Sequence, residues 1–366
     1  TDSPKGTQGI SLFLVPKFKI NEDGSIGSKN GISTGSLESK MGVKGSATCV
    51  LNFDDAVGYM IGLKNKGLSA MFTMMNNARL NVAVQGLAVA ERSYQRALQW
   101  AKERIQGTDI SGRSKEKVPI IRPPDVRRML MDMKSQIEAI RALCYSVAEA
   151  LDLAGQHPNG AIREQYRGYL ELMIPIAKAW STDQGFEIAS TGVQVHGGMG
   201  YIEETGAAQY LRDARITMIY EGTNGIQALD LIRRKLPREN TALKKMFLDM
   251  HETTRELQEN GDSSLRATGE QLKSAVSALQ DATEWMLEHV STELEAAASG
   301  ATQYCRMFGF VAGGWLLAKN ALEATKLDAN EAEISGVGSR KRQVAQFFAE
   351  QNLGPAAALL GPITNA

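Results

Sequence analysis

The order of apolar and polar residues divides the chain into a short β-rich start and a long helical remainder. Apolar, β-branched and aromatic residues form short runs at 10–16, 46–53 and 56–62, with turn residues between them. We expect these runs to be antiparallel strands. Since two or three strands alone are marginally stable, we expect them to belong to a larger β-domain whose earlier strands lie outside this chain.

From about residue 69 the apolar residues recur at helical spacing. The pattern predicts helices over 70–106, 124–155, 161–190 and 224–236. Pro124 suits the first turn of the second helix, and Pro175 either kinks the third or marks a restart. Four long helices with modest connections predict a helix bundle.

Further amphipathic stretches follow a plausible linker at 236–240. They predict helices around 241–259, 264–295, 300–325 and 339–352. The expected fold is therefore mainly α: a partial antiparallel β-domain over 1–65, a four-helix bundle over 66–236 and an additional C-terminal helical domain over 237–366.

Composition excludes several classes of function. The chain has 366 residues, and both Lys+Arg and Asp+Glu number 41, with no basic block. This balance disfavours nucleic acid as a partner, because phosphate binding needs clustered positive charge. No apolar run is long enough to span a bilayer. The cysteines (49, 144, 305) and histidines (157, 196, 251, 289) show neither disulfide nor metal-site spacing, so we expect no metal and a reducing cytoplasm.

One stretch that interrupts the helical pattern is QVHGGMGY, residues 194–201, here called the glycine loop. Its glycines allow positive φ and close backbone approach, and consecutive N–H groups can hold a phosphate or pyrophosphate. It follows a helix and lacks Rossmann spacing. An ordinary turn between bundle helices is the alternative.

The second is IYEGTNG, residues 219–225, here called the glutamate loop. Glu221 lies among apolar residues and beside a glycine, and Thr223 or Asn224 is suited to cap the next helix. A carboxylate with apolar neighbours would have a raised pKa, which suits a general base near neutral pH. A solvated loop glutamate beside an ordinary helix cap is the alternative.

Together the two loops and the helices around them resemble the acyl-CoA dehydrogenase family. The resemblance covers about residues 7–236, in the family's order. RDARITMIYEGTNGIQALDLIRRKL (212–236) resembles its catalytic segment, and QVHGGMGYIEE (194–204) its flavin-contacting loop. Other similar segments are AKERIQG (101–107), 74–98, 124–130 and 175–190.

The flanks of the chain fit the same family. Residues 6–18 and 38–53 resemble the second half of its middle β-domain, so the N-terminal helical domain and early β-domain are expected to be missing. The region after 236 resembles the longer branch, which includes 3-methylmercaptopropionyl-CoA dehydrogenase-like enzymes.

The resemblance implies α,β-dehydrogenation of an acyl-CoA thioester. Glu221 would remove the α-proton while a hydride leaves Cβ for flavin N5 of FAD, giving a trans-2-enoyl-CoA. The Glu221 backbone N–H would bind the thioester carbonyl, Gly222 would leave room for it and Tyr220 would line the pocket. A short or medium acyl chain is expected.

The remaining site residues are also carried over by resemblance. Cofactor contacts to FAD would come from Arg104, Gln106, Gln194, Val195, Gly197, Gly198, Thr223, Asn224 and Gly225. The first six of these would reach the FAD of a neighbouring subunit. Asn76 and Arg79 occupy the place of an Asp-x-x-Arg contact to acyl-CoA, although Arg79 could be only a surface charge. Pro123 replaces a frequent histidine, which puts one flavin contact in doubt.

The implied partners are an acyl-CoA, an electron-transfer flavoprotein and a second copy of the chain, as a homodimer or dimer of dimers. An acyl-CoA oxidase, in which O₂ takes the electrons, is the alternative on the same fold. A non-catalytic flavin-binding or scaffold relative is the alternative outside the enzymes.

Overall fold

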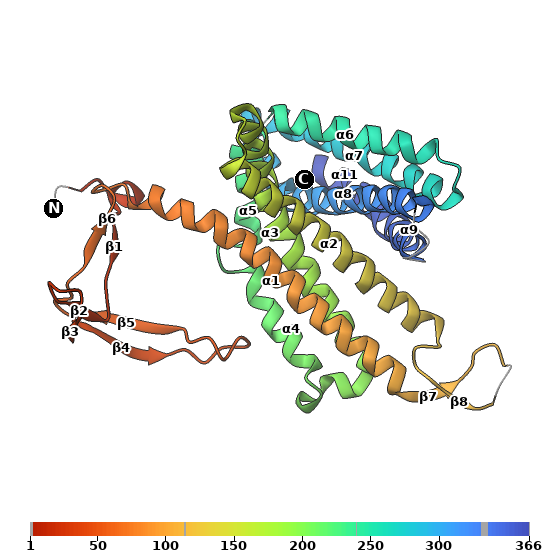
Figure 1. The fold of residues 1–366 in the computed structure, drawn as a ribbon, viewed down its shortest axis with the longest axis horizontal. Coiled ribbons are helices and arrows are strands. Elements are labelled where there is room, and N and C mark those ends of the chain that lie inside the picture. Colours follow the sequence, from red (N-terminus) through yellow and green to blue (C-terminus); the bar gives the residue numbers. More distant parts are fainter. Residues whose placement is uncertain (1–2, 113–114, 239, 331–335, 366) are drawn as a thin grey trace. The chain divides into compact units, whose positions relative to one another are not determined.

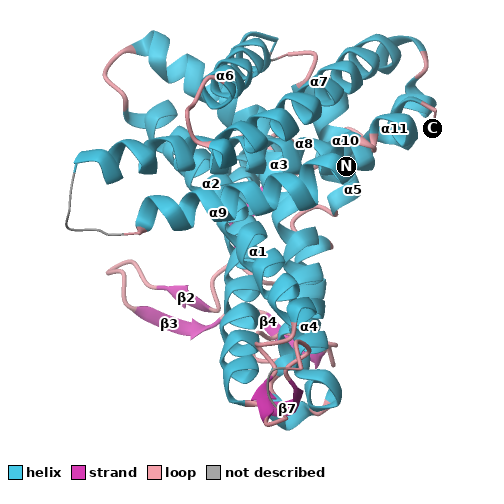
Figure 2. Cartoon of the chain, turned by 90° about the vertical axis from the view of Figure 1, so that its right-hand side faces the viewer, coloured by secondary structure: helices cyan, strands magenta, loops and turns pink. Residues whose placement is uncertain are grey.

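The computed structural model describes residues 3–112, 115–238, 240–330 and 336–365. Most of this part of the chain is helical, and its strands are few and short (Figures 1 and 2). The chain divides into two compact units, Thr1–Ala78 and Arg79–Ala366. A mainly helical fold with small antiparallel sheets at the start confirms the predicted fold class.

The first unit contains three antiparallel strand pairs. β1 (Leu12–Leu14) pairs with β6 (Tyr59–Ile61), β2 (Phe18–Ile20) with β3 (Ile26–Lys29), and β4 (Ile32–Leu37) with β5 (Cys49–Phe53). The apolar runs correctly predicted β1, β5 and β6. They did not predict β2, β3 and β4.

A buried asparagine holds the loops of this unit together. Asn30 is 3% exposed. Its amide donates to the carbonyls of Pro16 and Val57, and its Oδ1 accepts from the N–H groups of Val57 and Gly31. By contrast, Phe13, Leu14 and other apolar strand residues are exposed in this unit. The expectation that these strands belong to a larger β-domain stays a prediction.

The bundle helices form close to where the sequence predicts them. α1 (Gly67–Glu103) begins in the first unit and continues into the second, and α2 (Pro124–Gln156) starts with Pro124 in its first turn. α3 (Gly160–His196) passes through Pro175 without a break. α4 (Ala207–Arg215), α5 (Asn224–Asp230) and a π-helical segment, η5 (Leu231–Lys235), complete this region.

The expectation that the first helix reaches residue 106 was wrong. Ile105–Thr108 is instead a strand, β7, which pairs with β8 (Lys117–Pro119).

Four main helices make up the C-terminal part: α6 (Asn240–Gln258), α7 (Ser263–Thr292), α8 (Leu294–Asn330) and α9 (Val337–Phe348). Three short segments follow: π-helical η6 (Ala349–Leu353), α10 (Gly354–Ala357) and α11 (Leu360–Thr364). α8 packs against α2, α3 and α5 as well as α7 and α9. Residues 79–366 therefore share one core, while the division into domains at residues 65 and 236 stays a prediction.

α3 is the central helix of this core. Its middle, from Leu172 to Thr182, is buried on every face, as expected for a helix that is apolar all round. Trp180, 1% exposed, fills a groove on α8 that two glycines leave open. A Cβ on Gly309 would lie 2.2 Å from a Trp180 atom, and one on Gly313 would lie 2.7 Å away. The two glycines thus let α3 and α8 approach closely.

We predict that Gly309→Ala destabilises the protein by about 1–3 kcal/mol, because the added methyl group overpacks the Trp180 contact. Gly155→Ala is the control, since a Cβ there meets nothing within 4 Å. The control should be neutral or raise stability by about 0.4–1 kcal/mol. The measurement is urea unfolding followed by circular dichroism. Equal stability of the two variants would contradict this account of the α3–α8 contact.

Candidate active site

The glutamate loop has a strained backbone at its centre. Glu221 has φ 56° and Gly222 φ 87°. A residue with a side chain, Glu221, therefore adopts the left-handed conformation. Such a conformation costs a non-glycine residue roughly 1–2 kcal/mol. Thr223 then caps α5 by accepting from the Ile226 N–H, which confirms the predicted cap. The Glu221 side chain itself is exposed to solvent.

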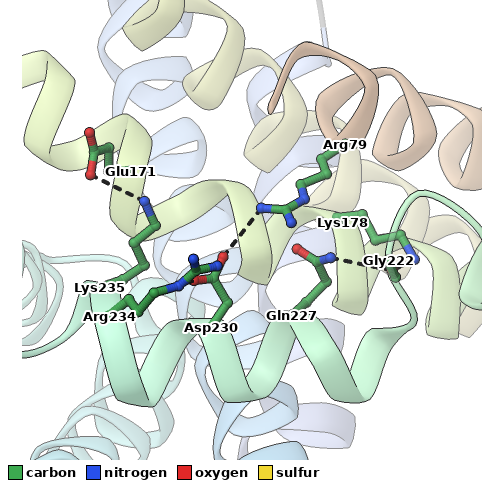
Figure 3. Close-up of polar contacts among 8 residues, drawn as sticks. All are labelled: Arg79, Glu171, Lys178, Gly222, Gln227, Asp230, Arg234 and Lys235. Atoms are coloured by element: carbon green, nitrogen blue, oxygen red, sulfur yellow. Dashed lines mark hydrogen bonds and ion pairs between the residues drawn. The ribbon is translucent and has the colours of Figure 1, made fainter. Parts of the chain in front are cut away.

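Two buried side chains hold the Gly222 carbonyl from different directions (Figure 3). The Lys178 Nζ on α3 donates to it at 2.8 Å, and the Gln227 Nε2 on α5 donates at 3.3 Å. A Cβ on Gly222 would lie 2.6 Å from Gln227 Nε2, so the glycine is needed for space as well as for its φ. Before the strained residues, the Tyr220 hydroxyl donates to the Gln85 side chain.

Asn224 completes the support beneath the loop. Its Oδ1 accepts from Lys178 Nζ at 2.8 Å, and its Nδ2 donates to the Asp183 carboxylate at 2.6 Å. Nδ2 also contacts the Thr182 hydroxyl and the Ala179 carbonyl. The Asn224 side chain is thus engaged with α3. A contact between Asn224 and FAD stays a prediction. Because the side chain is occupied, such a contact would come from the backbone of Asn224.

Lys178 is a cation in an apolar position. The residue is 0% exposed, and its Nζ donates to two neutral oxygens, those of the Gly222 carbonyl and the Asn224 amide. Burial, with a smaller contribution from the Arg79 charge, lowers the pKa of Lys178 to about 8, against the opposing effects of the Asp183 and Glu221 carboxylates.

Arg79 is buried rather than exposed, so its interpretation as a surface charge was wrong. It is 4% exposed and lies 3.2 Å from the Asp230 carboxylate, whose side chain is 2% exposed. Asp230 also pairs with Arg234 on η5 (Figure 3). The ion pair fixes α1 to α5 directly behind the glutamate loop. Asn76 lies three residues earlier on α1 and is partly buried, and its contact with acyl-CoA stays a prediction.

The glycine loop begins where α3 ends. Gln194 is exposed on the last turn of α3, whereas the Val195 side chain is buried and leaves only its backbone for a ligand. Gly197 has φ 62°, and a Cβ on Gly197 or Gly198 would meet nothing within 4 Å. The two glycines therefore expose their backbone to a ligand that approaches closely.

His196 and Trp100 join the glycine loop to the end of α1. Their rings stack with centroids 5.3 Å apart. His196 is 4% exposed, and its Nδ1 contacts the Gly192 carbonyl, while burial lowers the pKa of the imidazole. Arg104 lies four residues after Trp100, Gln106 follows in β7, and both are exposed. The stack thus places the glycine loop beside the end of α1, after which these two residues follow in the chain.

The glutamate loop lies far from this group. Lys178 and His196 are eighteen residues apart on α3, or roughly 27 Å at 1.5 Å per residue. The residues predicted to contact FAD therefore form two separate clusters. Thr223 and Gly225 belong to the cluster with Glu221, and both are exposed there. Pro123 lies at the N-cap of α2.

Comparison with known proteins identifies the family. A model described as acyl-CoA dehydrogenase, C-terminal domain, matches residues 65–236. A second, described as acetyl-CoA dehydrogenase C-terminal like, matches residues 233–366. The 3-methylmercaptopropionyl-CoA dehydrogenase of Ruegeria pomeroyi is 40% identical over 357 residues, which are 96% of this chain and 60% of that protein. The chain belongs to the acyl-CoA dehydrogenase family.

Two solved structures share the fold. Caenorhabditis elegans ACDH-11, in complex with C11-CoA, has a TM-score of 0.77 at 24% identity. The match covers 95% of this chain and 54% of the ACDH-11 chain. An acyl-CoA dehydrogenase from Bacillus anthracis, complexed with FAD, has a TM-score of 0.72 at 20% identity and covers 96% and 60%. The chain thus spans somewhat more than half the length of these family members.

Three buried polar residues of this acyl-CoA dehydrogenase family member were missed by the sequence reasoning: Lys178, Gln227 and Asp230. Lys178 had a usable signal, because it is a single charge inside the apolar run from Leu172 to Trp180. Gln227 and Asp230 carried no such signal. They lie on a short amphipathic helix where polar residues usually face solvent.

Among the described residues, no helix has a stretch long and apolar enough to cross a membrane. No group of three or more His, Cys, Asp or Glu residues among them is arranged to hold a metal ion.

We predict that Asp230→Asn destabilises the protein by about 3–5 kcal/mol, because it leaves the Arg79 charge buried without its carboxylate. Glu164→Gln is the matched control. Its Arg167 partner is exposed, and loss of such a pair costs at most about 1 kcal/mol. Guanidinium unfolding curves measure both. Similar small effects would show that the buried pair contributes no more than a surface pair.

Lys178 also predicts a pH dependence of stability. Because its pKa is lower in the folded chain, the unfolded chain binds this proton more tightly between about pH 8 and the ordinary lysine pKa. Below about pH 8 the buried charge lowers the free energy of unfolding by its full amount, and this destabilisation decreases as the pH rises. The free energy of unfolding of wild type should therefore rise from pH 7 to 9.5 relative to that of Lys178→Met. A constant difference between the two would contradict the shift.

Proposed function

We propose that this chain carries the catalytic base of an FAD-dependent acyl-CoA dehydrogenase. The observation that carries the proposal is the backbone of the glutamate loop, which holds Glu221 in a left-handed conformation above buried supports from α1, α3 and α5. Residues held in such conformations persist only when their surroundings fix them, and they cluster at active sites. Membership in the family supports the same conclusion.

In the proposed reaction Glu221 removes the α-proton of a saturated acyl-CoA thioester. The C–H electron pair forms the new double bond as a hydride leaves Cβ, and the product is a trans-2-enoyl-CoA. When bound, FAD supplies the acceptor for that hydride. The Glu221 N–H would donate to the thioester carbonyl as negative charge develops there. Gly222 would leave the carbonyl room, and Tyr220, fixed by Gln85, would line the pocket.

The residues of both clusters fit a dinucleotide. At the glycine loop, Gly197 and Gly198 leave space for a backbone contact, and Gln194 is exposed, as are Arg104 and Gln106 just beyond the end of α1. Arg104 offers a guanidinium that suits a pyrophosphate. Thr223 and Gly225 would contact FAD beside Glu221. Because the clusters are far apart, we propose that they serve two FAD molecules, with the glycine loop reaching that of a second copy.

The proposal extends to substrate and partners. A short or medium acyl-CoA is favoured by the name of the Ruegeria pomeroyi relative, with 3-methylmercaptopropionyl-CoA as one candidate. An electron-transfer flavoprotein would receive the electrons, and the protein would work as a homodimer or dimer of dimers. Asn76 would contact the acyl-CoA, and Arg79 would act mainly by fixing α1 behind the loop.

We predict that Glu221→Gln keeps its FAD but reduces it at least about 10²–10⁴-fold more slowly, because the general base is lost. The test uses the polypeptide that contains this chain at its natural full length. Butyryl-, octanoyl- and 3-methylmercaptopropionyl-CoA are added without oxygen, and bleaching of the flavin spectrum is followed. The thioester that bleaches wild type fastest identifies the preferred chain length.

Glu256→Gln is the control, because it removes an exposed carboxylate on α6 far along the chain from the loop. It should behave as wild type. Wild-type protein that holds no flavin would favour a scaffold role. Rapid reoxidation in air by substrate-reduced enzyme would instead favour an acyl-CoA oxidase.

A further inference from the structure

Lys178 is a buried cation whose hydrogen bonds lead to the glutamate loop. Its Nζ lies 2.8 Å from both the Gly222 carbonyl and Asn224 Oδ1, on either side of Thr223, which caps α5. Figure 3 shows Lys178 and Gly222 side by side. One ammonium group therefore bridges the residue after Glu221 and the first residue of α5.

The surroundings of Lys178 do not stabilise a buried positive charge, because its hydrogen-bond acceptors are neutral. Burying an ammonium costs free energy unless a carboxylate neutralises it. Asp183 is near enough to act on it electrostatically, but the Asp183 carboxylate accepts from Asn224. A methionine would fill a similar volume in this apolar stretch of α3 without that cost. The ammonium is explained by the neutral oxygens that it holds.

One of those oxygens, the Gly222 carbonyl, belongs to the strained part of the loop. Glu221 and Gly222 both have positive φ, and relaxing Glu221 to an ordinary conformation would turn the neighbouring peptide groups. Hydrogen bonds to the Gly222 carbonyl oppose this rotation. Lys178 donates one from α3, and Gln227 donates a longer one, at 3.3 Å, from α5 itself. Of these two donors to the Gly222 carbonyl, the lysine is the one that comes from a different helix, at the buried centre of the core.

We propose that Lys178 is a positioning residue, which holds the Gly222 carbonyl and the Asn224 amide and thereby keeps Glu221 in its left-handed conformation. The proposal rests on the proposed function for its effect on catalysis, but its effect on the loop is independent of any activity. Other charged groups act on Lys178 from the elements around it: Asp183 on α3, Arg79 on α1 and Glu221 on the loop. Lys178 would not touch the reacting atoms.

The test replaces the ammonium and compares the loop with the rest of the protein. Lys178→Met removes the donor and keeps the length of the side chain. Lys235→Met is the matched control: it breaks a 3.1 Å ion pair with Glu171, again to α3, with no contact to the loop (Figure 3). Hydrogen–deuterium exchange of peptides covering 216–228 is measured on the full-length protein. We expect about tenfold faster exchange in Lys178→Met only.

The second measurement separates positioning from binding. In Lys178→Met, anaerobic flavin reduction should slow by about 10- to 100-fold, as a small misplacement of the base can cost that much. Acyl-CoA binding and flavin content should change less than threefold, and Lys235→Met should match wild type. If wild type shows no flavin reduction, the proposed function fails, while the exchange result still decides the role of Lys178.

Unchanged exchange of 216–228 in Lys178→Met would overturn the proposal. So would exchange that rises equally throughout the core, because that marks a general loss of stability. If Lys178→Met does not fold, Lys178→Gln serves instead: its amide stays polar but is too short to reach both acceptors. It should give the same local increase in exchange, and protection like that of wild type would contradict the proposed role.

Discussion

The close contact between α3 and α8 is the constraint on which the helical part of the protein depends. Trp180 on α3 occupies space that Gly309 and Gly313 leave on α8, and Phe310 packs edge-on against the same ring. Because the middle of α3 is buried on all sides, its position is fixed by this contact and by α2 together. The C-terminal helices are therefore part of the core that holds α3 in place.

The candidate active site depends on that same helix. Lys178 lies two residues before Trp180, so the packing that fixes the indole also fixes the ammonium that reaches the Gly222 carbonyl. Asp183, three residues after Trp180, receives the Asn224 amide. The ion pair between Arg79 and Asp230 adds a connection to α1. A loop with unfavourable backbone angles can persist here because three helices hold it.

The sequence was sufficient for the helices with strong apolar periodicity and insufficient for features that depend on backbone geometry. α2 begins at Pro124 as predicted, and Thr223 caps α5 as predicted. The strands β2, β3 and β4 were missed because β2 has only three residues and because polar residues and glycines interrupt β3 and β4, so that no apolar run marks them. The end of α1 was misplaced because Ile105 continues the apolar pattern while pairing in a strand.

At the site, the loop around Glu221 and its resemblance to the family predicted the glutamate. They did not predict the buried residues that support the loop. The positive φ of Glu221 follows from tertiary contacts that no local pattern encodes. Burial of Arg79 likewise depends on Asp230, 151 residues later in the chain. A lone lysine in an apolar run was the one available clue to Lys178, and a lysine can equally extend to the surface along its apolar stem.

α3 contacts both clusters of candidate residues, through Lys178 at the glutamate loop and through His196 at the glycine loop. Both the length of helix between these two residues and its rotation therefore matter. With 3.6 residues per turn, the eighteen residues from Lys178 to His196 make five whole turns, so the two side chains leave α3 on the same side. Inserting or deleting one residue between them would rotate one cluster about 100° relative to the other. Evolution can thus exchange residues freely along the exposed positions of this segment, but it can change the segment's length only by steps close to a whole turn.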